Sequence, residues 1–122
     1  MNTTAMERDW LLVTTVSNIR VSDIGLAVYA ETGIRRDEIN GNRRDAETVT
    51  ARHIVMYLAR ELTNQSYPQI GRELGGKDHT SVMNGHHRMA ERLQADTELS
   101  ALIARCKRRA MALAVSKNER VA

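Results

Sequence analysis

The stretch SYPQIGRELGGKDHTSV, residues 66–82, constrains the fold more than any other part of the chain. Ser66 and Gln69 have the spacing of a capping box at a helix N-terminus, with a proline in the first turn, where its missing N–H group is not needed. The glycine pair that follows can adopt positive φ and end that helix. Asp78 then suits the N-cap of a second helix. Two helices joined by such a short turn predict a helix-turn-helix.

The same stretch contains the order G-x-x-x-x-G-K from Gly71 to Lys77, which is how a phosphate-binding loop begins. That loop must follow a β-strand and needs Ser or Thr next, to bind magnesium. Here Asp78 occupies that place, and Gly71 lies inside the first predicted helix. We therefore interpret the glycines as turn residues and expect the chain to bind no nucleotide.

Two helical segments are predicted upstream of this motif. Thr4 with Glu7 can form a capping box for a first segment that runs through Trp10. Ser22 can cap a second helix, whose apolar residues have helical spacing until Gly33 ends it.

A short turn flanked by Ile34 and Ile39 and a polar loop at residues 41–48 are expected next. The helix after this loop has one apolar face: Ile54, Val55, Leu58 and Leu62.

The second helix of the motif is predicted to bury a stripe made of Val82, His86, Met89 and Leu93. A last helix beginning near Asp96 has its own apolar stripe: Leu99, Leu102, Ile103, Cys106, Ala110 and Leu113. An apolar stripe of this length is expected to pack against another element, and we expect that element to be the segment around Trp10 or a second copy of the chain. The sequence thus predicts an all-α protein with a helix-turn-helix domain at 20–95, an extension at 1–19 and a C-terminal helix with a basic tail at 96–122.

Several function classes are disfavoured by composition. The most apolar run, residues 54–59, is far shorter than the roughly 20 residues that cross a bilayer. The single cysteine, Cys106, suggests a reduced, cytoplasmic protein and a small buried side chain without a catalytic partner. His86 and His87 are adjacent and diverge on a helix, so we expect no metal site. We predict neither enzymatic activity nor a cofactor, and we expect His86 to border the core.

Positive charge is unevenly distributed along a chain with net charge +3. One cluster lies before the motif and another in the last helix: Arg35, Arg36, Arg43, Arg44, Arg52 and Arg60, then Arg105, Lys107, Arg108 and Arg109. Both patterns are consistent with solvated helix faces or with a polyanionic partner.

In a helix-turn-helix, the first turn of the second helix enters the major groove of DNA. The exposed side chains there would be Lys77, Asp78, His79, Thr80 and Ser81. A carboxylate can accept from the cytosine amino group, and a threonine methyl can contact the thymine methyl. The alternative is that Asp78 and Thr80 only cap the helix, because helix-turn-helix geometry also occurs in proteins that bind no DNA.

The sequence at residues 51–82, ARHIVMYLARELTNQSYPQIGRELGGKDHTSV, resembles the C-terminal DNA-binding domain of the bacterial replication initiator DnaA. Within it, GGKDHTSV is close to that family's signature. The resemblance covers residues 20–95, more weakly upstream, where the matching positions are Ile24, Val28, Ile34, Ile39 and the pair Arg43-Arg44. It implies a Trp-repressor-like fold with extra terminal helices and double-stranded DNA as the partner.

The resemblance also implies roles for individual residues. Asp78, His79 and Thr80 match positions that read bases in the major groove, and Pro68 approaches the DNA from the preceding helix. Arg44 matches an arginine that enters the adjacent minor groove. The residues assigned to the phosphate backbone are Arg43, Arg52, His53, Arg60, Tyr67, Lys77 and Ser81.

Three residues depart from the family pattern. Thr50 replaces a basic residue, Ala51 a proline and His53 a glutamine. These changes can weaken phosphate contacts, but they leave the base-reading turn intact. Residues 1–20 contain neither a Walker motif nor the lid helices that precede the domain in the initiator, so we expect a stand-alone relative that does not hydrolyse ATP.

Two functions remain open. The chain can be a nucleoid-associated, sequence-specific regulator that binds DnaA-box-like sites and controls replication initiation or transcription. Alternatively, it can be an interaction module whose terminal helices hold a protein partner or a second copy, with DNA binding secondary.

Overall fold

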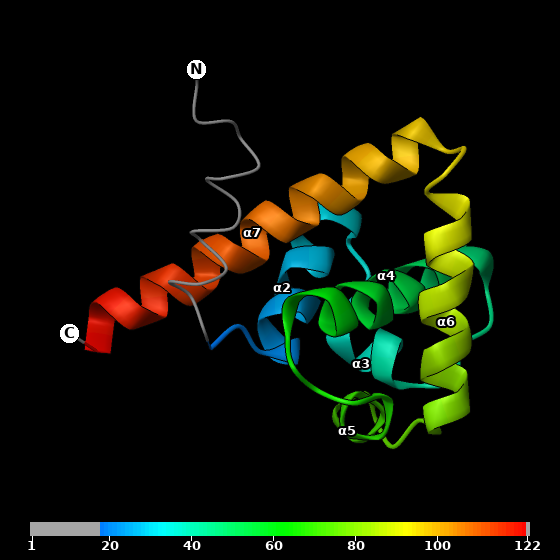
Figure 1. Ribbon diagram of the computed structural model, residues 1–122, viewed down its shortest axis with the longest axis horizontal. Helices are drawn as coiled ribbons and strands as arrows, with labels where there is room; N and C mark the ends of the chain where they lie inside the picture. The colour runs from blue at the N-terminus through cyan, green and yellow to red at the C-terminus, as the bar shows by residue number, and fades with distance from the viewer. Residues whose placement is uncertain (1–17, 122) are drawn as a thin grey trace.

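The computed structural model describes residues 18–121 and their side chains as far as Ser116. These residues form helices joined by short connections, without a strand among them (Figure 1). The helices are α2 (Val21–Thr32), α3 (Arg36–Asn40), α4 (Ala46–Leu62), α5 (Tyr67–Glu73), α6 (His79–Arg92) and α7 (Thr97–Val121). The expected segment from Thr4 through Trp10 lies outside the described residues. The prediction of an all-α fold is confirmed.

Helix α2 begins at Val21, so the prediction that Ser22 caps it is wrong. The carboxylate of Asp23 instead reaches back and accepts a hydrogen bond from the backbone N–H of Arg20, at 3.0 Å. A carboxylate three residues inside the helix can satisfy this N–H group without a serine. The predicted end at Gly33 is confirmed by its φ of 79°.

The connection between α2 and α4 is more helical than expected. A single turn of helix, α3, replaces the predicted turn, and it buries Ile39. Helix α4 starts at Ala46, which shortens the loop from the predicted 41–48 to residues 41–45. The reason is Asp45, whose carboxylate accepts hydrogen bonds from the N–H and the hydroxyl of Thr48, at 3.1 and 2.8 Å.

Helix α4 runs through the middle of the molecule, with α6 crossing one end of it and α5 lying below (Figure 1). Ile54, Val55 and Leu58 are fully buried, as predicted, whereas Leu62 is only partly buried. On α6 the predicted stripe is confirmed, with Val82 and Met89 at its centre and His86 and Leu93 at its edges.

The stripe of α7 is covered by α2, a neighbour that the sequence did not indicate (Figure 1). The buried residues of α7 include the cysteine: Leu99, Ile103, Cys106, Ala110, Met111 and Ala114. Two arginines of the second basic cluster, Arg105 and Arg109, both bind the carboxylate of Glu31 on α2, Arg105 through Nε at 2.8 Å. These hydrogen bonds lower the pKa of Glu31. Arg105 and Arg109 therefore join α7 to α2.

Within the described residues, no helix has the length and apolar character that crossing a membrane requires.

Candidate nucleic-acid interface

The two helices of the predicted motif are α5 and α6. Ser66 Oγ accepts a hydrogen bond from the Gln69 N–H, and the Gln69 side chain accepts one from the Ser66 N–H, at 3.3 and 2.8 Å. The capping box read from the sequence is therefore confirmed. It begins α5 with Pro68 exposed in the first turn.

The turn between these helices depends on three glycines. Gly75 and Gly76 both have φ of 79°, in the left-handed region that favours glycine. The Lys77 N–H donates to the carbonyl oxygen of Gly71 at 2.8 Å, which folds the turn back on α5. A Cβ atom on Gly71 would lie 2.1 Å from the Lys77 carbonyl oxygen, so only glycine permits this close return.

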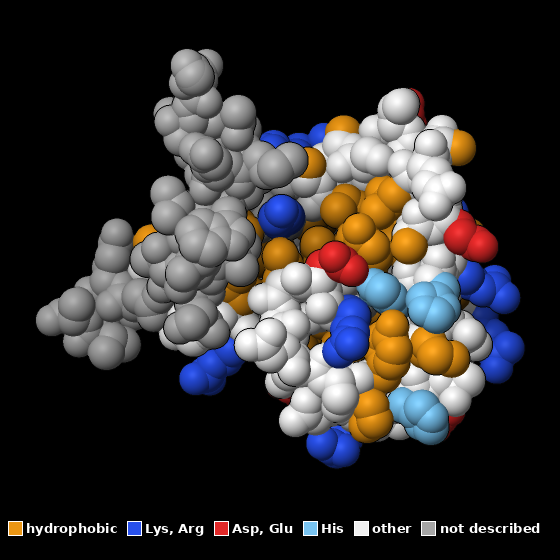
Figure 2. Space-filling view, viewed as in Figure 1, with side chains coloured by type: hydrophobic (Ala, Val, Ile, Leu, Met, Phe, Trp, Pro, Cys, Tyr) orange, Lys and Arg blue, Asp and Glu red, His pale blue; other side chains and the backbone are white. Residues whose placement is uncertain are grey.

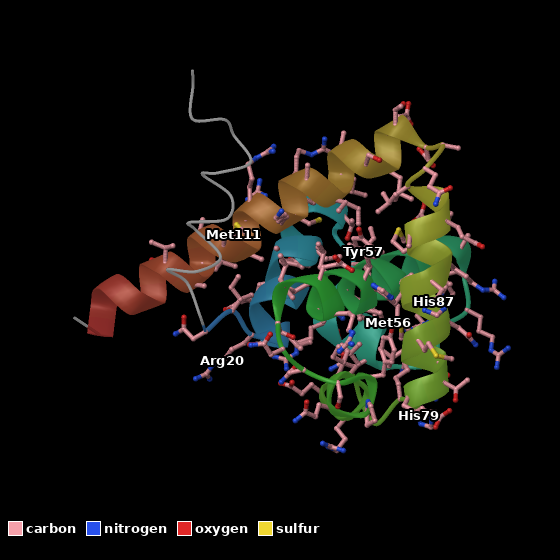
Figure 3. All side chains as sticks on the ribbon, in the orientation of Figure 1. Arg20, Met56, Tyr57, His79, His87 and Met111 are labelled. Carbon is pink, nitrogen blue, oxygen red and sulfur yellow. The ribbon has the colours of Figure 1, made fainter. Side chains whose placement is uncertain are left out.

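The first turn of α6 presents polar side chains to solvent. The Asp78 carboxylate accepts a hydrogen bond from the Thr80 N–H at 3.3 Å and thus caps the helix, as predicted. Its other oxygen lies 3.5 Å from Nδ1 of His79, and both side chains remain more than half exposed. Thr80 and Ser81 are exposed as well. Capping therefore leaves the side chains of this turn accessible. His79 lies at the N-terminal end of α6, next to solvent (Figure 3).

A polar network joins α5 to α4 and to the middle of α6. The hydroxyl of Tyr67 lies 3.1 Å from Nδ1 of His86, and Nε2 of His86 lies 2.9 Å from the Glu61 carboxylate. The guanidinium of Arg60 lies over the Tyr67 ring, 4.9 Å from its centroid, and donates to the Gln65 carbonyl. Figure 2 shows histidine and hydrophobic side chains side by side over this part of the surface. His86 borders the core, as predicted.

An open hollow lies on the other side of α6, between the 41–45 loop and α4. Its lining residues are Gly41, Asn42, Arg44, Val49, Arg52, His53, Met56, Lys77 and Ser81. Five of them are residues that the sequence assigned to DNA contact: Arg44, Arg52, His53, Lys77 and Ser81. The fold therefore places the basic loop next to the first turn of α6.

Two of these cations already have partners. Arg52 is 8% exposed and donates four hydrogen bonds to backbone carbonyls, those of Glu38, Ile39, Gly41 and Arg43. Lys77 Nζ donates to the carbonyls of Asn40 and Gly41, at 2.8 and 2.7 Å. Both side chains therefore bind the protein backbone in a place where the sequence suggested only phosphate contacts.

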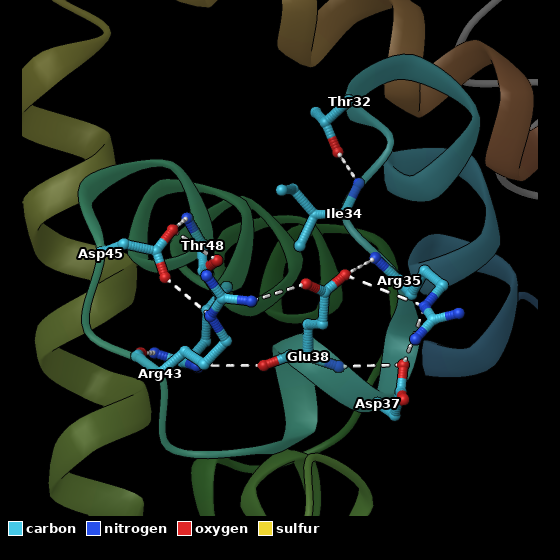
Figure 4. Close-up of polar contacts among 9 residues, drawn as sticks. Thr32, Ile34, Arg35, Asp37, Glu38, Arg43, Asp45 and Thr48 are labelled. Carbon is cyan, nitrogen blue, oxygen red and sulfur yellow. Dashed lines mark hydrogen bonds and ion pairs between the residues drawn. The ribbon is translucent and has the colours of Figure 1, made fainter.

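The two arginines of the basic loop differ from each other. Arg43 forms ion pairs with Glu38 at 3.1 Å and with Asp45 at 3.0 Å (Figure 4). Arg44 is exposed and forms no ion pair or hydrogen bond within residues 18–121. It is thus the loop cation whose guanidinium is available to another molecule.

Sequence reasoning missed one cation of this surface, Arg88. It is exposed on α6 seven residues after Ser81, and seven residues are almost two helical turns, so the two share a face. Its charge adds to burial in lowering the pKa of the neighbouring His53. The spacing from Ser81 was a signal in the sequence that could have identified it.

A capped short helix, a glycine turn and a second helix with an exposed polar first turn define a helix-turn-helix protein. The sequence matches the family described as "Bacterial dnaA protein helix-turn-helix" over residues 21–89, and the chain belongs to this family.

Relatives of this chain include chromosomal replication initiator proteins DnaA from several bacteria. The protein from Rhizobium meliloti (strain 1021) is 41% identical over 90 residues, which are 74% of this chain and 19% of the relative. That from Latilactobacillus sakei is 40% identical over 87 residues, 71% of this chain and 19% of the relative. The chain therefore spans about a fifth of the length of these relatives.

Proposed function

We propose that the chain binds double-stranded DNA in a sequence-specific manner, at sites of the DnaA-box type. The first turn of α6 enters the major groove, where Asp78, His79 and Thr80 read base edges, with Pro68 beside them. Arg44 enters the adjacent minor groove. The observation that carries this proposal is the hollow that places Arg44 beside the start of α6.

Contacts to the phosphate backbone lie on both sides of the recognition turn in this proposal. Arg60 and Tyr67 serve one strand from the ends of α4 and α5. His53 and Ser81 serve the other from the hollow, and Arg88, with no ion pair or hydrogen bond among the described residues, extends that side along α6. Such contacts position the protein, whereas the base contacts specify the sequence.

The role in the cell follows from where these sites lie. The relatives are named as replication initiators, and binding at an origin would place this chain in the control of initiation. Binding at promoters would make it a transcription regulator. Mapping of bound sites across the genome, compared with those of the initiator of the same cell, distinguishes the two roles.

The test begins with selection of a cognate duplex from a random-sequence pool. Affinity for that duplex and for a scrambled one is then measured over a salt series. Thr80→Ala should lose discrimination of roughly 1–3 kcal/mol at one or two base pairs. Arg60→Ala should weaken binding to both duplexes and reduce the magnitude of the log-affinity against log-salt slope by about one.

Two outcomes would contradict the proposal. Selection that enriches no sequence would remove the claim of specificity. If Thr80→Ala and Arg60→Ala lowered affinity for both duplexes by the same factor, the first turn of α6 would not be reading bases.

A further inference from the structure

The segment from α3 into the basic loop is held by cations from two separate elements. Arg52 comes from α4 and Lys77 from the turn that precedes α6. Between them they donate to the backbone carbonyls of Glu38, Ile39, Asn40, Gly41 and Arg43. The carbonyl of Gly41 accepts from both, at 3.2 Å from Arg52 and 2.7 Å from Lys77.

Three of these carbonyls, those of Glu38, Ile39 and Asn40, belong to the last residues of α3, and those of Gly41 and Arg43 follow it. The last carbonyls of a helix have no partner within it, and positive charge is favourable at that end. Arg52 uses four of its five N–H donors here, and Lys77 uses two of its three. Burial, and then the nearby charge of Arg52, lowers the pKa of Lys77. Withdrawing these donors toward a phosphate would remove the side-chain partners of these carbonyls, of which only that of Glu38 also accepts from a backbone N–H, that of Gly41.

The backbone of the turn between α5 and α6 also approaches the end of α3 closely. A Cβ atom on Gly75, in the turn between α5 and α6, would lie 2.3 Å from the carbonyl oxygen of Asn40. Asn40 is also the residue whose carbonyl accepts from Lys77. The helix-turn-helix turn and the base of the 41–45 loop are therefore packed backbone to backbone.

We propose that Lys77 and Arg52 are positioning residues that hold Arg44 in register with the first turn of α6. Minor-groove and major-groove reading are then coupled through the protein, and Lys77 contributes to DNA binding through Arg44. This inference rests on the proposed function, because it concerns how two parts of that interface are kept together.

A double-mutant cycle tests the inference, since residues that act through one contact are not additive. Affinity for the selected duplex is measured for the wild type, Lys77→Met, Arg44→Ala and the double variant. Lys77→Met alone should lower affinity by about as large a factor as Arg44→Ala. In the Arg44→Ala background it should change affinity less than about twofold and leave the salt slope unchanged. The matched control is Arg60→Ala, whose factor should multiply with that of Arg44→Ala.

Base-pair discrimination separates positioning from simple destabilisation. Changing A·T to G·C at the position read by Arg44 should lower wild-type affinity, and Lys77→Met should lose this preference as Arg44→Ala does. A smaller folded fraction lowers affinity for both duplexes equally and leaves their ratio unchanged. If Lys77→Met lacks helical circular dichroism, Lys77→Gln replaces it in the same cycle.

One outcome of the same cycle would contradict the inference. Lys77→Met and Arg44→Ala could instead lower affinity by factors that multiply in the double variant, with a salt slope reduced by about one for Lys77→Met. Lys77 would then be an independent phosphate contact, and the inference would be overturned. The proposed function fails separately, when the wild type itself shows no preference for a selected duplex over a scrambled one.

Discussion

Replacing Gly75 with alanine should destabilise the protein more than the same change at Gly76. Both residues have φ of 79°, and alanine in the left-handed region costs about 1–2 kcal/mol. Nothing lies within 4 Å of a Cβ atom on Gly76, so Gly76→Ala should lower the free energy of unfolding only by this conformational cost. A Cβ atom on Gly75 meets the Asn40 carbonyl oxygen at 2.3 Å, and displacing that backbone adds roughly 1–3 kcal/mol. The expected loss for Gly75→Ala is therefore about 2–5 kcal/mol.

Urea unfolding followed by circular dichroism measures these losses as changes in the free energy of unfolding. Gly33→Ala is the matched control, because Gly33 has the same φ of 79° and no atom within 4 Å of its Cβ position. Gly33→Ala should lower the free energy of unfolding by about as much as Gly76→Ala does. Equal losses for Gly75→Ala and Gly76→Ala would refute the reasoning, since the contact with Asn40 would then impose no constraint.

Three further predictions concern other parts of the molecule. Gly71→Ala should lose several kcal/mol in urea unfolding, because its Cβ would overlap the Lys77 carbonyl oxygen, whereas Gly25→Ala, inside a helix with open space, should gain roughly 0.5–1 kcal/mol; equal effects would contradict this. Burial and neighbouring arginines lower the pKa of His53, so as pH falls the unfolded chain takes up a proton at this residue before the folded protein does. The free energy of unfolding should therefore drop below about pH 6.5, and less steeply in His53→Gln than in the wild type. The same pH dependence in both proteins would contradict this. Burial raises the pKa of Cys106 to about 11, so at neutral pH iodoacetamide should modify it only in unfolded molecules, and more slowly as the protein is made more stable. Fast modification of the folded protein would show that the thiol is accessible.

Most of the helix-turn-helix could be predicted because its signals are local. Ser66 and Gln69 satisfy each other's N–H groups over three residues, and Asp78 caps the helix that follows it. Such interactions depend on the order of residues and hardly on the rest of the fold. The errors near α2 and α3 arose where an acidic side chain inside the helix replaced the expected serine cap or initiated an unexpected turn of helix, as Asp23 and Glu38 do.

The sequence by itself determined that Asp78, His79, Thr80 and Ser81 are exposed at the recognition turn and which helices have an apolar face, but its prediction that Lys77 is exposed there was wrong. Only the tertiary structure decided what those faces and charges meet. Lys77 binds a carbonyl 37 residues away, and Arg105 binds a carboxylate 74 residues away. The sequence pattern cannot distinguish a lysine that binds phosphate from one that binds backbone carbonyls, because the two need the same donors. The choice depends on where folding places the end of α3, and that position is set by the packing of α2, α4 and the glycine turn together.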